Sequence, residues 1–371
     1  MKKIGTLTTH SALNYGAILQ AYALSTYINK YQDVDCEIID YQPQYVEKSY
    51  KLIKKPSSVK DIALVFFQLL HYQERKKRKD KFLDFKEKKL HLSHITAKNR
   101  DDIIPLANSY DLIFCGSDQI WSPRLHNFDE AYFLSFPEIR TVKVSYAASF
   151  GQDYISEKDK EELRHRLKSF AKFGCREYTA QNIILELTDK TPQMVLDPVF
   201  LLNAEEWRKL ESPVGTNEKY ILAYFLSNPG KTLSQIEKKA KVENIHTYSI
   251  GFSPRDYKYK VITKYDLGPA EFLVAIDNAD IVITNSFHAT AFSIILKKNF
   301  FVRIGEGTET RNDRIISLLK MIGLEDRIFT DKNADKIDFS SSIDYAKIEK
   351  NMSKWISASK DYIREVLDTL I

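Results

Sequence analysis

One polar loop late in the 371-residue chain contains a histidine and stands between two strongly apolar segments. Residues 284–290 read TNSFHAT and separate the apolar runs 279–283 and 291–296. His288 can exchange a proton near neutral pH, and a helix beginning near Ala289 would point its free amides at an anion. The alternative is a histidine that only caps its own helix. We expect a ligand site here, formed by Asn285, Ser286 and His288.

A basic segment follows the next strand-like run. Residues 305–314 read GEGTETRNDR and place Arg311 and Arg314 three positions apart at the start of a predicted helix. A guanidinium group binds carboxylate or phosphate through two parallel hydrogen bonds, and residues three apart on a helix reach the same side. The alternative is a solvated helix end. We expect both arginines to bind an anionic substrate.

The sequence GSDQIW, residues 116–121, is the most unusual loop of the first half. Asp118 could act as a base or bind a hydroxyl group, and Ser117 lies beside it. Trp121 offers a flat apolar face of the kind that stacks on sugars. The alternative is that Gly, Ser and Asp only cap the following helix.

Two further loops of the first half carry candidate residues. Asn14 and Gly16 lie in HSALNYGAILQ, where a single glycine before a helix would let the backbone approach a phosphate. Arg176 and Glu177 stand together after a strand-like run; their alternative is a surface ion pair worth less than about 1 kcal/mol. Asp197, before Pro198, favours a turn.

Several kinds of chemistry find no support in the sequence. The eight histidines are scattered without a metal-binding spacing, and there is no GxGxxG, P-loop or GxSxG motif. The three cysteines (Cys36, Cys115 and Cys175) are too dispersed for a disulfide framework and indicate free thiols in a reducing cytoplasm. We therefore expect no metal and no cofactor.

Composition narrows the class of partner. The net charge of +5 suits an anionic small molecule, whereas nucleic-acid binding is poorly supported because the basic run is interleaved with acids. No signal peptide and no run of about 18 apolar residues is visible, so we expect a cytoplasmic protein without a transmembrane span.

Strand-like and helix-like segments alternate along most of the chain, which predicts an α/β fold. Residues 3–8, 17–30 and 36–41 predict strand, helix and strand, and the alternation restarts near residue 220. In open parallel sheets ligands bind at the carboxyl ends of the strands, where nearly all the polar loops lie. We expect two Rossmann-like domains facing a cleft, namely residues 1–210 and 211–340, with a terminal helix, 341–371, packing back across them.

Residues 43–100 differ from the rest of the first domain. They are rich in lysine and aromatic residues and predict a helical insertion with one heavily charged arm. Such a helix can be a solvated face above an apolar face packed on the domain. The alternative is a peripheral contact with a membrane surface or an anionic acceptor.

The ordered series of loops resembles the polysaccharide pyruvyl transferase family. The resemblance rests on NYGAILQAYAL, DLIFCGSDQIW, SYAASFG, CREYTA, VLDPVFLL, GPAEFLVAIDNADIVITNSFHATAFSIIL and RNDRIISLLKMIGLEDRI, and it covers nearly the whole chain outside the insertion and the terminal helix. It implies a GT-B-like fold and an enzyme that moves the enolpyruvyl group of phosphoenolpyruvate onto two hydroxyls of a sugar, forming a pyruvate ketal for a cell-surface or exopolysaccharide.

The resemblance also implies roles for individual residues. His288 matches the family's histidine and would protonate the enol carbon or stabilise the departing phosphate, while Asp118 or Glu177 would serve as the base. The acceptor could be lipid-linked, with the enzyme at the inner face of the membrane. Ala289 stands where many relatives carry glycine, which puts the identity of the acceptor in question. The competing functions are a GT-B-type nucleotide-sugar glycosyltransferase and a non-catalytic saccharide-binding relative.

Overall fold

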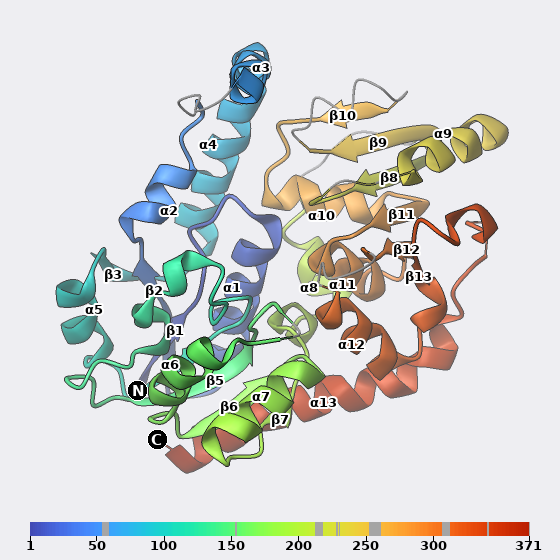
Figure 1. Ribbon diagram of the computed structural model, residues 1–371. Helices are drawn as coiled ribbons and strands as arrows, with labels where there is room; N and C mark the ends of the chain where they lie inside the picture. Colours follow the sequence, from blue (N-terminus) through green and yellow to red (C-terminus); the bar gives the residue numbers. More distant parts are fainter. Residues whose placement is uncertain are drawn as a thin grey trace.

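Two parallel β-sheets lie side by side in the computed structural model, each covered by helices on both faces (Figure 1). The structure describes residues 1–53, 59–152, 154–211, 218–227, 229, 231–251, 261–305, 312–339 and 341–370. Arg311 and residues 212–217 of the expected linker lie outside these ranges. The predicted class, α/β with two Rossmann-like domains, is confirmed.

The first sheet has seven parallel strands in the order β3-β2-β1-β4-β5-β6-β7. Its central strands are buried on both faces, which explains their unbroken apolar sequences, such as LIFC in β4. The strands are β1 Lys2–Leu7, β2 Val34–Tyr41, β3 Leu92–Ala97, β4 Leu112–Cys115, β5 Val142–Ala148, β6 Lys172–Cys175 and β7 Gln193–Met194. The helices are α1 Tyr15–Ile28, α2 Gln44–Ser49, α3 Val59–Leu70, α4 Tyr72–Lys89, α5 Arg100–Ala107, α6 Glu157–Leu167, α7 Tyr178–Thr188 and α8 Ala204–Arg208.

The insertion is shorter than the sequence suggested. Residues 44–49, 59–70 and 72–89 form the predicted helices, α2, α3 and α4. Residues 92–97, however, form β3, an edge strand of the first sheet, and α5 packs on it. We missed β3 because three consecutive residues in its middle are exposed and it contains no apolar run. In Figure 1 the insertion rises from the first sheet beside the second domain, with α3 at its tip.

The second sheet repeats the same strand order with six strands, β10-β9-β8-β11-β12-β13. These strands are β8 Tyr220–Tyr224, β9 His246–Ile250, β10 Ile262–Lys264, β11 Ile281–Thr284, β12 Asn299–Arg303 and β13 Ile328–Phe329. The helices are α9 Thr232–Glu243, α10 Pro269–Asp277, α11 Phe287–Ile295, α12 Asp313–Ile322 and α13 Tyr345–Leu370. Loops at the carboxyl ends of central strands from both sheets meet between the domains.

Helix α13 joins the two domains (Figure 1). At its start, the Tyr345 hydroxyl donates to the Lys298 carbonyl of the second domain at 2.6 Å. Near its end, the Tyr362 hydroxyl donates to the Ser145 carbonyl of β5 at 2.8 Å, and Ile363 is fully buried beneath the first sheet. Among the described residues no helix is both long and apolar enough to cross a membrane.

Candidate functional site

A cleft of about 450 Å³ lies between the two domains at the carboxyl ends of their strands. The first domain contributes Asn14, Asp118, Gln119, Ser122 and Arg124 to its walls, among others. The second domain contributes Asn285, Ser286, His288, Arg303, Asn312 and Arg314. With Gly151 and Leu226, which also line the cleft, the structure brings together loops from six separate strands, as expected for a doubly wound fold.

The loop TNSFHAT turns the chain from β11 into α11. Ser286 caps the helix, accepting from the Ala289 amide at 3.4 Å, and its own amide donates to the Thr284 hydroxyl. The Asn285 side chain accepts from the Leu226 amide at 2.7 Å and so ties the loop to the neighbouring strand. These bonds fix the first turn of α11, on which His288 projects toward the first domain.

His288 packs directly against the beginning of α1. A Cβ atom placed on Gly16 would lie only 1.9 Å from His288 Nδ1. Gly16 is therefore required by the ring of the facing domain, a reason different from the phosphate approach that we predicted. The other ring nitrogen, Nε2, lies 3.7 Å from Asp197 Oδ2, an ionic contact longer than a hydrogen bond, and it has no hydrogen-bond partner among the described residues.

Arg176 is the centre of a buried ionic network. Its guanidinium donates to Asp197, to Asp118 at 3.1 Å and to the Ser117 hydroxyl at 3.3 Å, and Nε lies 3.5 Å from Glu177. The Arg176 side chain is 1% exposed. Arg176 and Glu177 are thus not a surface ion pair. Arg176 is not among the described residues that line the cleft, and it holds the carboxylates in place from beneath it.

The network shifts the pKa values of its members in opposite directions. Burial alone would raise the pKa of Asp118, but the charges of Arg176, His288 and Arg314 outweigh it and lower that pKa. For Asp197 burial is likewise overcome, by His288 and Arg176, and its pKa lies well below the usual range. Both aspartates are therefore ionised at neutral pH.

Glu177 behaves differently from the two aspartates. Burial raises its pKa to about 7, and the nearby positive charge of Arg176 only partly opposes this effect. Its Oε2 atom has no hydrogen-bond partner among the described residues, and the side chain is 3% exposed. Glu177 contacts Arg176 on the side away from the cleft, and it is not among the described residues that line the cleft.

Arg314 reaches the cleft from the start of α12. Its Nη1 atom lies 3.5 Å from Asp118 Oδ1, and with the Gln119 amide oxygen turned toward it, Gln119 accepts from both terminal nitrogens at 3.2 and 3.0 Å. Burial and the neighbouring Arg176 lower the pKa of Arg314 to about 10, so it remains a cation at neutral pH.

Two predicted binding residues face the protein interior. Trp121 is completely buried and packs against Phe133, Phe150 and Phe170, so the prediction that it stacks on a sugar is wrong. Ser117 is also completely buried and contacts the carboxylate of Asp197 at 3.0 Å. Both residues anchor the GSDQIW loop to the interior of the first domain.

Asp197 is the residue whose importance the sequence understated. It starts a short turn, accepting from the Val199 amide at 3.2 Å as Asp-Pro predicts, but its carboxylate also binds Arg176 and faces His288. Asp197 follows β7, at the same edge of the sheet where Asp118 follows β4, and this position could have identified it from the sequence. Among the described residues no group of three or more His, Cys, Asp or Glu side chains could hold a metal ion.

Solved structures with the same fold share little sequence with this chain. A protein described as a UDP-N-acetylglucosamine 2-epimerase from Listeria monocytogenes has a TM-score of 0.58 and 9% identity, covering 100% of this chain and 96% of that one. S. aureus MnaA with UDP scores 0.54 at 12% identity, covering 100% and 98%. The Neisseria meningitidis UDP-GlcNAc 2-epimerase bound to UDP-GlcNAc scores 0.52 at 13%, covering 100% of both chains. These likenesses confirm the GT-B-like architecture.

Comparison with curated protein sequences gives no match. The sequence profile of one family does match, over residues 14–304, a stretch that runs from the Asn14 cap through His288 to the end of β12. Since this stretch covers well over half of the chain and most of the cleft, the chain belongs to the polysaccharide pyruvyl transferase family, a family of transferases.

Proposed function

We propose that the chain transfers the enolpyruvyl group of phosphoenolpyruvate onto two hydroxyls of one sugar. In this reaction the methylene carbon gains a proton and becomes a methyl group. Two bonds form between the central carbon and the sugar oxygens, the bond to the phosphate oxygen breaks, and phosphate leaves. One hydroxyl proton balances the new methyl proton, and the other leaves with phosphate or solvent.

The observation that carries this proposal is the concentration of cations around one histidine and one carboxylate in the cleft. Arg124 and Arg314 line it together with His288 and Asp118. Phosphoenolpyruvate bears a phosphate and a carboxylate, and guanidinium groups bind both. The first turn of α11 adds backbone amides at the same place.

Within this scheme His288 supplies the proton to the enol carbon or stabilises the departing phosphate. Asp118 is the base for the sugar hydroxyl, because it lines the cleft and its lowered pKa keeps it ionised. Glu177 acts as a positioning residue through Arg176. No metal or cofactor has a step in the proposal.

The test is the release of phosphate from phosphoenolpyruvate in the presence of a panel of sugars, with the pyruvyl ketal detected by mass spectrometry. His288→Gln should lower turnover by about 10²–10⁴-fold without loss of fold, as expected for a general acid. His165→Gln, an exposed histidine on α6, is the matched control. Near-normal phosphate release by His288→Gln would remove His288 from the mechanism.

A nucleotide-sugar glycosyltransferase is the second candidate. The observation favouring it is the structural likeness to proteins solved with UDP and UDP-GlcNAc. Release of a nucleotide from an activated sugar, without phosphate release from phosphoenolpyruvate, would decide for it. Saccharide binding without any donor-dependent turnover would indicate a non-catalytic relative.

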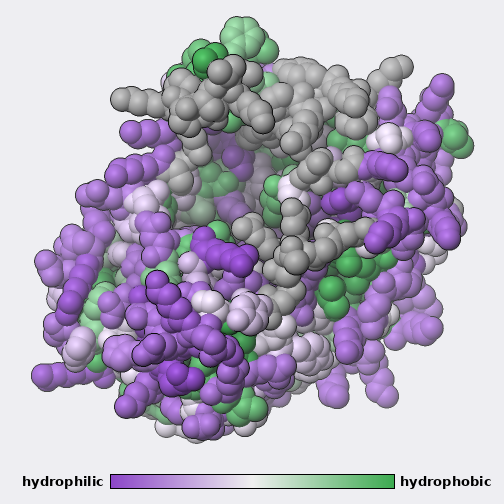
Figure 2. All heavy atoms as spheres, in the orientation of Figure 1, coloured by the Kyte–Doolittle hydropathy of each residue, from purple (hydrophilic) through white to green (hydrophobic). Residues whose placement is uncertain are grey.

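We also propose that helix α3 makes a peripheral contact with the cytoplasmic face of a membrane. Ile62, Phe66, Leu69 and Leu70 are all exposed and spaced to lie on one helix face, whereas Phe67 packs inward. Green apolar atoms gather at the same tip in Figure 2. The exposed lysines Lys76 and Lys77 follow at the start of α4. An apolar stripe beside basic residues suits an anionic bilayer, which would bring the enzyme to a lipid-linked acceptor.

A further inference from the structure

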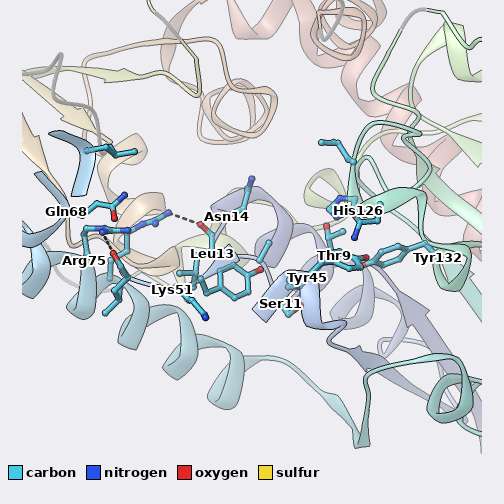
Figure 3. Close-up of a pocket in the computed structure, with 18 residues that line it drawn as sticks. Thr9, Ser11, Leu13, Asn14, Tyr45, Lys51, Gln68, Arg75, His126 and Tyr132 are labelled. Atoms are coloured by element: carbon cyan, nitrogen blue, oxygen red, sulfur yellow. Dashed lines mark hydrogen bonds between the residues drawn. The ribbon is translucent and has the colours of Figure 1, made fainter. Parts of the chain in front are cut away.

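A second cavity, of about 620 Å³, lies between the helical insertion and the loop that follows β1. We call it the insertion pocket; its walls include Ser11, Asn14, Tyr45, Lys51, Arg75 and His126. Figure 3 shows Arg75 with Gln68 at one end, His126 with Tyr132 at the other, and Leu13 with Asn14 between them. The pocket is therefore elongated, with chemically different ends.

One end of the insertion pocket is cationic. Lys51, Arg75 and Arg78 line it, and the described lining residues include no Asp or Glu. Arg78 is fixed in the wall, since it donates to the Leu13 carbonyl at 2.8 Å and to the Tyr15 hydroxyl at 3.1 Å. Arg75 and Arg78 share this wall, and burial together with the charge of Arg78 lowers the pKa of Arg75. Fixed guanidinium groups beside a lysine suit a phosphate or diphosphate.

The opposite end of the pocket borders the cleft. Asn14 lines both cavities, and the segment after GSDQIW separates them, with Arg124 facing the cleft and His126 facing the pocket. Three successive residues of that segment, His126 to Phe128, have φ angles of 55°, 53° and 50°. Side-chain-bearing residues rarely adopt this left-handed conformation, and strained backbone of this kind clusters at binding and active sites.

We propose that the insertion pocket binds the acceptor as a saccharide carrying a phosphate or diphosphate. The phosphate lies against Lys51 and Arg75, and the hydroxyls that receive the pyruvyl group lie between Asn14 and His126, beside the cleft. This assignment rests on the proposed function, because it is the transfer reaction that requires hydroxyls at the border of the two cavities.

The chemistry of the His126 end fits a neutral, hydroxyl-bearing ligand. Burial lowers the pKa of His126 despite the nearby negative charges of Asp118 and Asp129, so the ring is neutral at neutral pH and can accept a hydrogen bond from a hydroxyl. Tyr45 and Tyr132 add aromatic surface with polar hydroxyl ends, a combination suited to sugars.

Isothermal titration calorimetry of the full chain tests the pocket directly. The probes are inorganic pyrophosphate, glucose 1-phosphate, glucose, farnesyl diphosphate and UDP. We expect the phosphate-bearing probes to bind more tightly than glucose. Lys51→Gln and Arg75→Gln should each weaken them by about tenfold or more, the usual loss for a hydrogen bond to a charged group. The matched controls, Lys241→Gln on α9 and Arg164→Gln on α6, should bind as the wild type does.

The probes also separate the sources of the diphosphate. Tighter binding of farnesyl diphosphate supports a lipid-linked acceptor, and tighter binding of UDP supports a nucleotide-linked one. Equal affinity in the pocket variants and the wild type, no binding of any probe, or displacement of the probes by phosphoenolpyruvate would overturn the proposal. Should Arg75→Gln unfold, the exposed Lys51 still provides the test.

Phosphate release from phosphoenolpyruvate, measured on the same samples, keeps the two proposals apart. Probe binding that depends on Lys51 and Arg75, without any release, contradicts the transferase mechanism alone. Efficient pyruvylation of a phosphate-free sugar, unaffected by Lys51→Gln, contradicts the acceptor assignment alone.

Discussion

The cleft and the insertion pocket use positive charge in different ways. Beneath the cleft, Arg176 is enclosed by Asp118, Asp197 and Glu177, and Arg314 lies beside Asp118 in the cleft wall. The described lining of the insertion pocket contains three cations and no carboxylate, and its arginines donate to backbone carbonyls. Charges at the cleft therefore hold one another in place, whereas the charged side chains in the described lining of the pocket are all cations.

This contrast teaches that the two cavities should respond differently to substitution. Removal of a charge from the cleft leaves a buried partner uncompensated, which is costly to stability. Removal of a charge from the pocket should mainly affect binding.

The largest effect is expected for Arg176→Met. This change leaves Asp197 and Asp118 buried without their principal partner and should lower the free energy of unfolding by about 3–5 kcal/mol. Arg75→Met in the insertion pocket should cost only about 1 kcal/mol. Urea unfolding of the two variants measures the difference, and Arg176→Met/Asp197→Asn should recover part of the loss. Equal costs at the two sites would break the comparison.

Next in size is the pH dependence caused by Glu177. Between the ordinary pKa of a glutamate and about 7, the folded chain holds a proton on Glu177 that the unfolded chain has released. Stability therefore falls as the pH rises through this range, by up to about 3 kcal/mol. Glu177→Gln should remove this part of the slope in urea unfolding between pH 5 and 8. Parallel curves for the variant and the wild type would contradict the raised pKa.

A smaller effect is expected for Gly16→Ala. The added methyl group collides with His288 across the interface of the domains, and overpacking of this kind costs about 1–3 kcal/mol. Turnover should fall as well, because the ring has to move. The double variant Gly16→Ala/His288→Ala should regain stability but not activity. A single variant as stable and active as the wild type would show that the two domains separate at this contact.

The smallest effect on stability is expected at the tip of the insertion. Phe66→Ser on the exposed face of α3 should change the free energy of unfolding by less than about 0.5 kcal/mol. Co-sedimentation with anionic vesicles should nevertheless fall about tenfold, because a buried aromatic side chain is lost from the bilayer contact. Val242→Ser, which removes an exposed apolar side chain from α9, is the control. Unchanged sedimentation of Phe66→Ser would exclude this face as the membrane contact.

The strand–helix alternation and the edge at which the polar loops gather could be predicted because both are local properties. Apolar runs such as residues 281–283 identify strands, and parallel strands place their carboxyl ends together. For this reason the sequence alone predicts that His288, Asp118 and Arg314 lie at one cleft, and the structure confirms it.

The partners of each side chain could not be predicted in the same way. The carboxylates around Arg176 follow different strands, and their proximity depends on the order of strands in the sheet. Trp121 is enclosed by Phe133, Phe150 and Phe170, which come from three later segments of the chain, so the residues next to Trp121 give no sign of its burial.

The crossing of α13 has a consequence for biosynthesis. Tyr362, Ile363 and Val366 share one buried cluster with Ile4 and Leu112 of the first sheet. The strands of that sheet leave the ribosome early, but they acquire this layer of their core only when residues 362–366 have been synthesised. The two domains thus cannot mature one after the other, and a nascent chain stalled within the second domain should still expose the underside of the first sheet to chaperones.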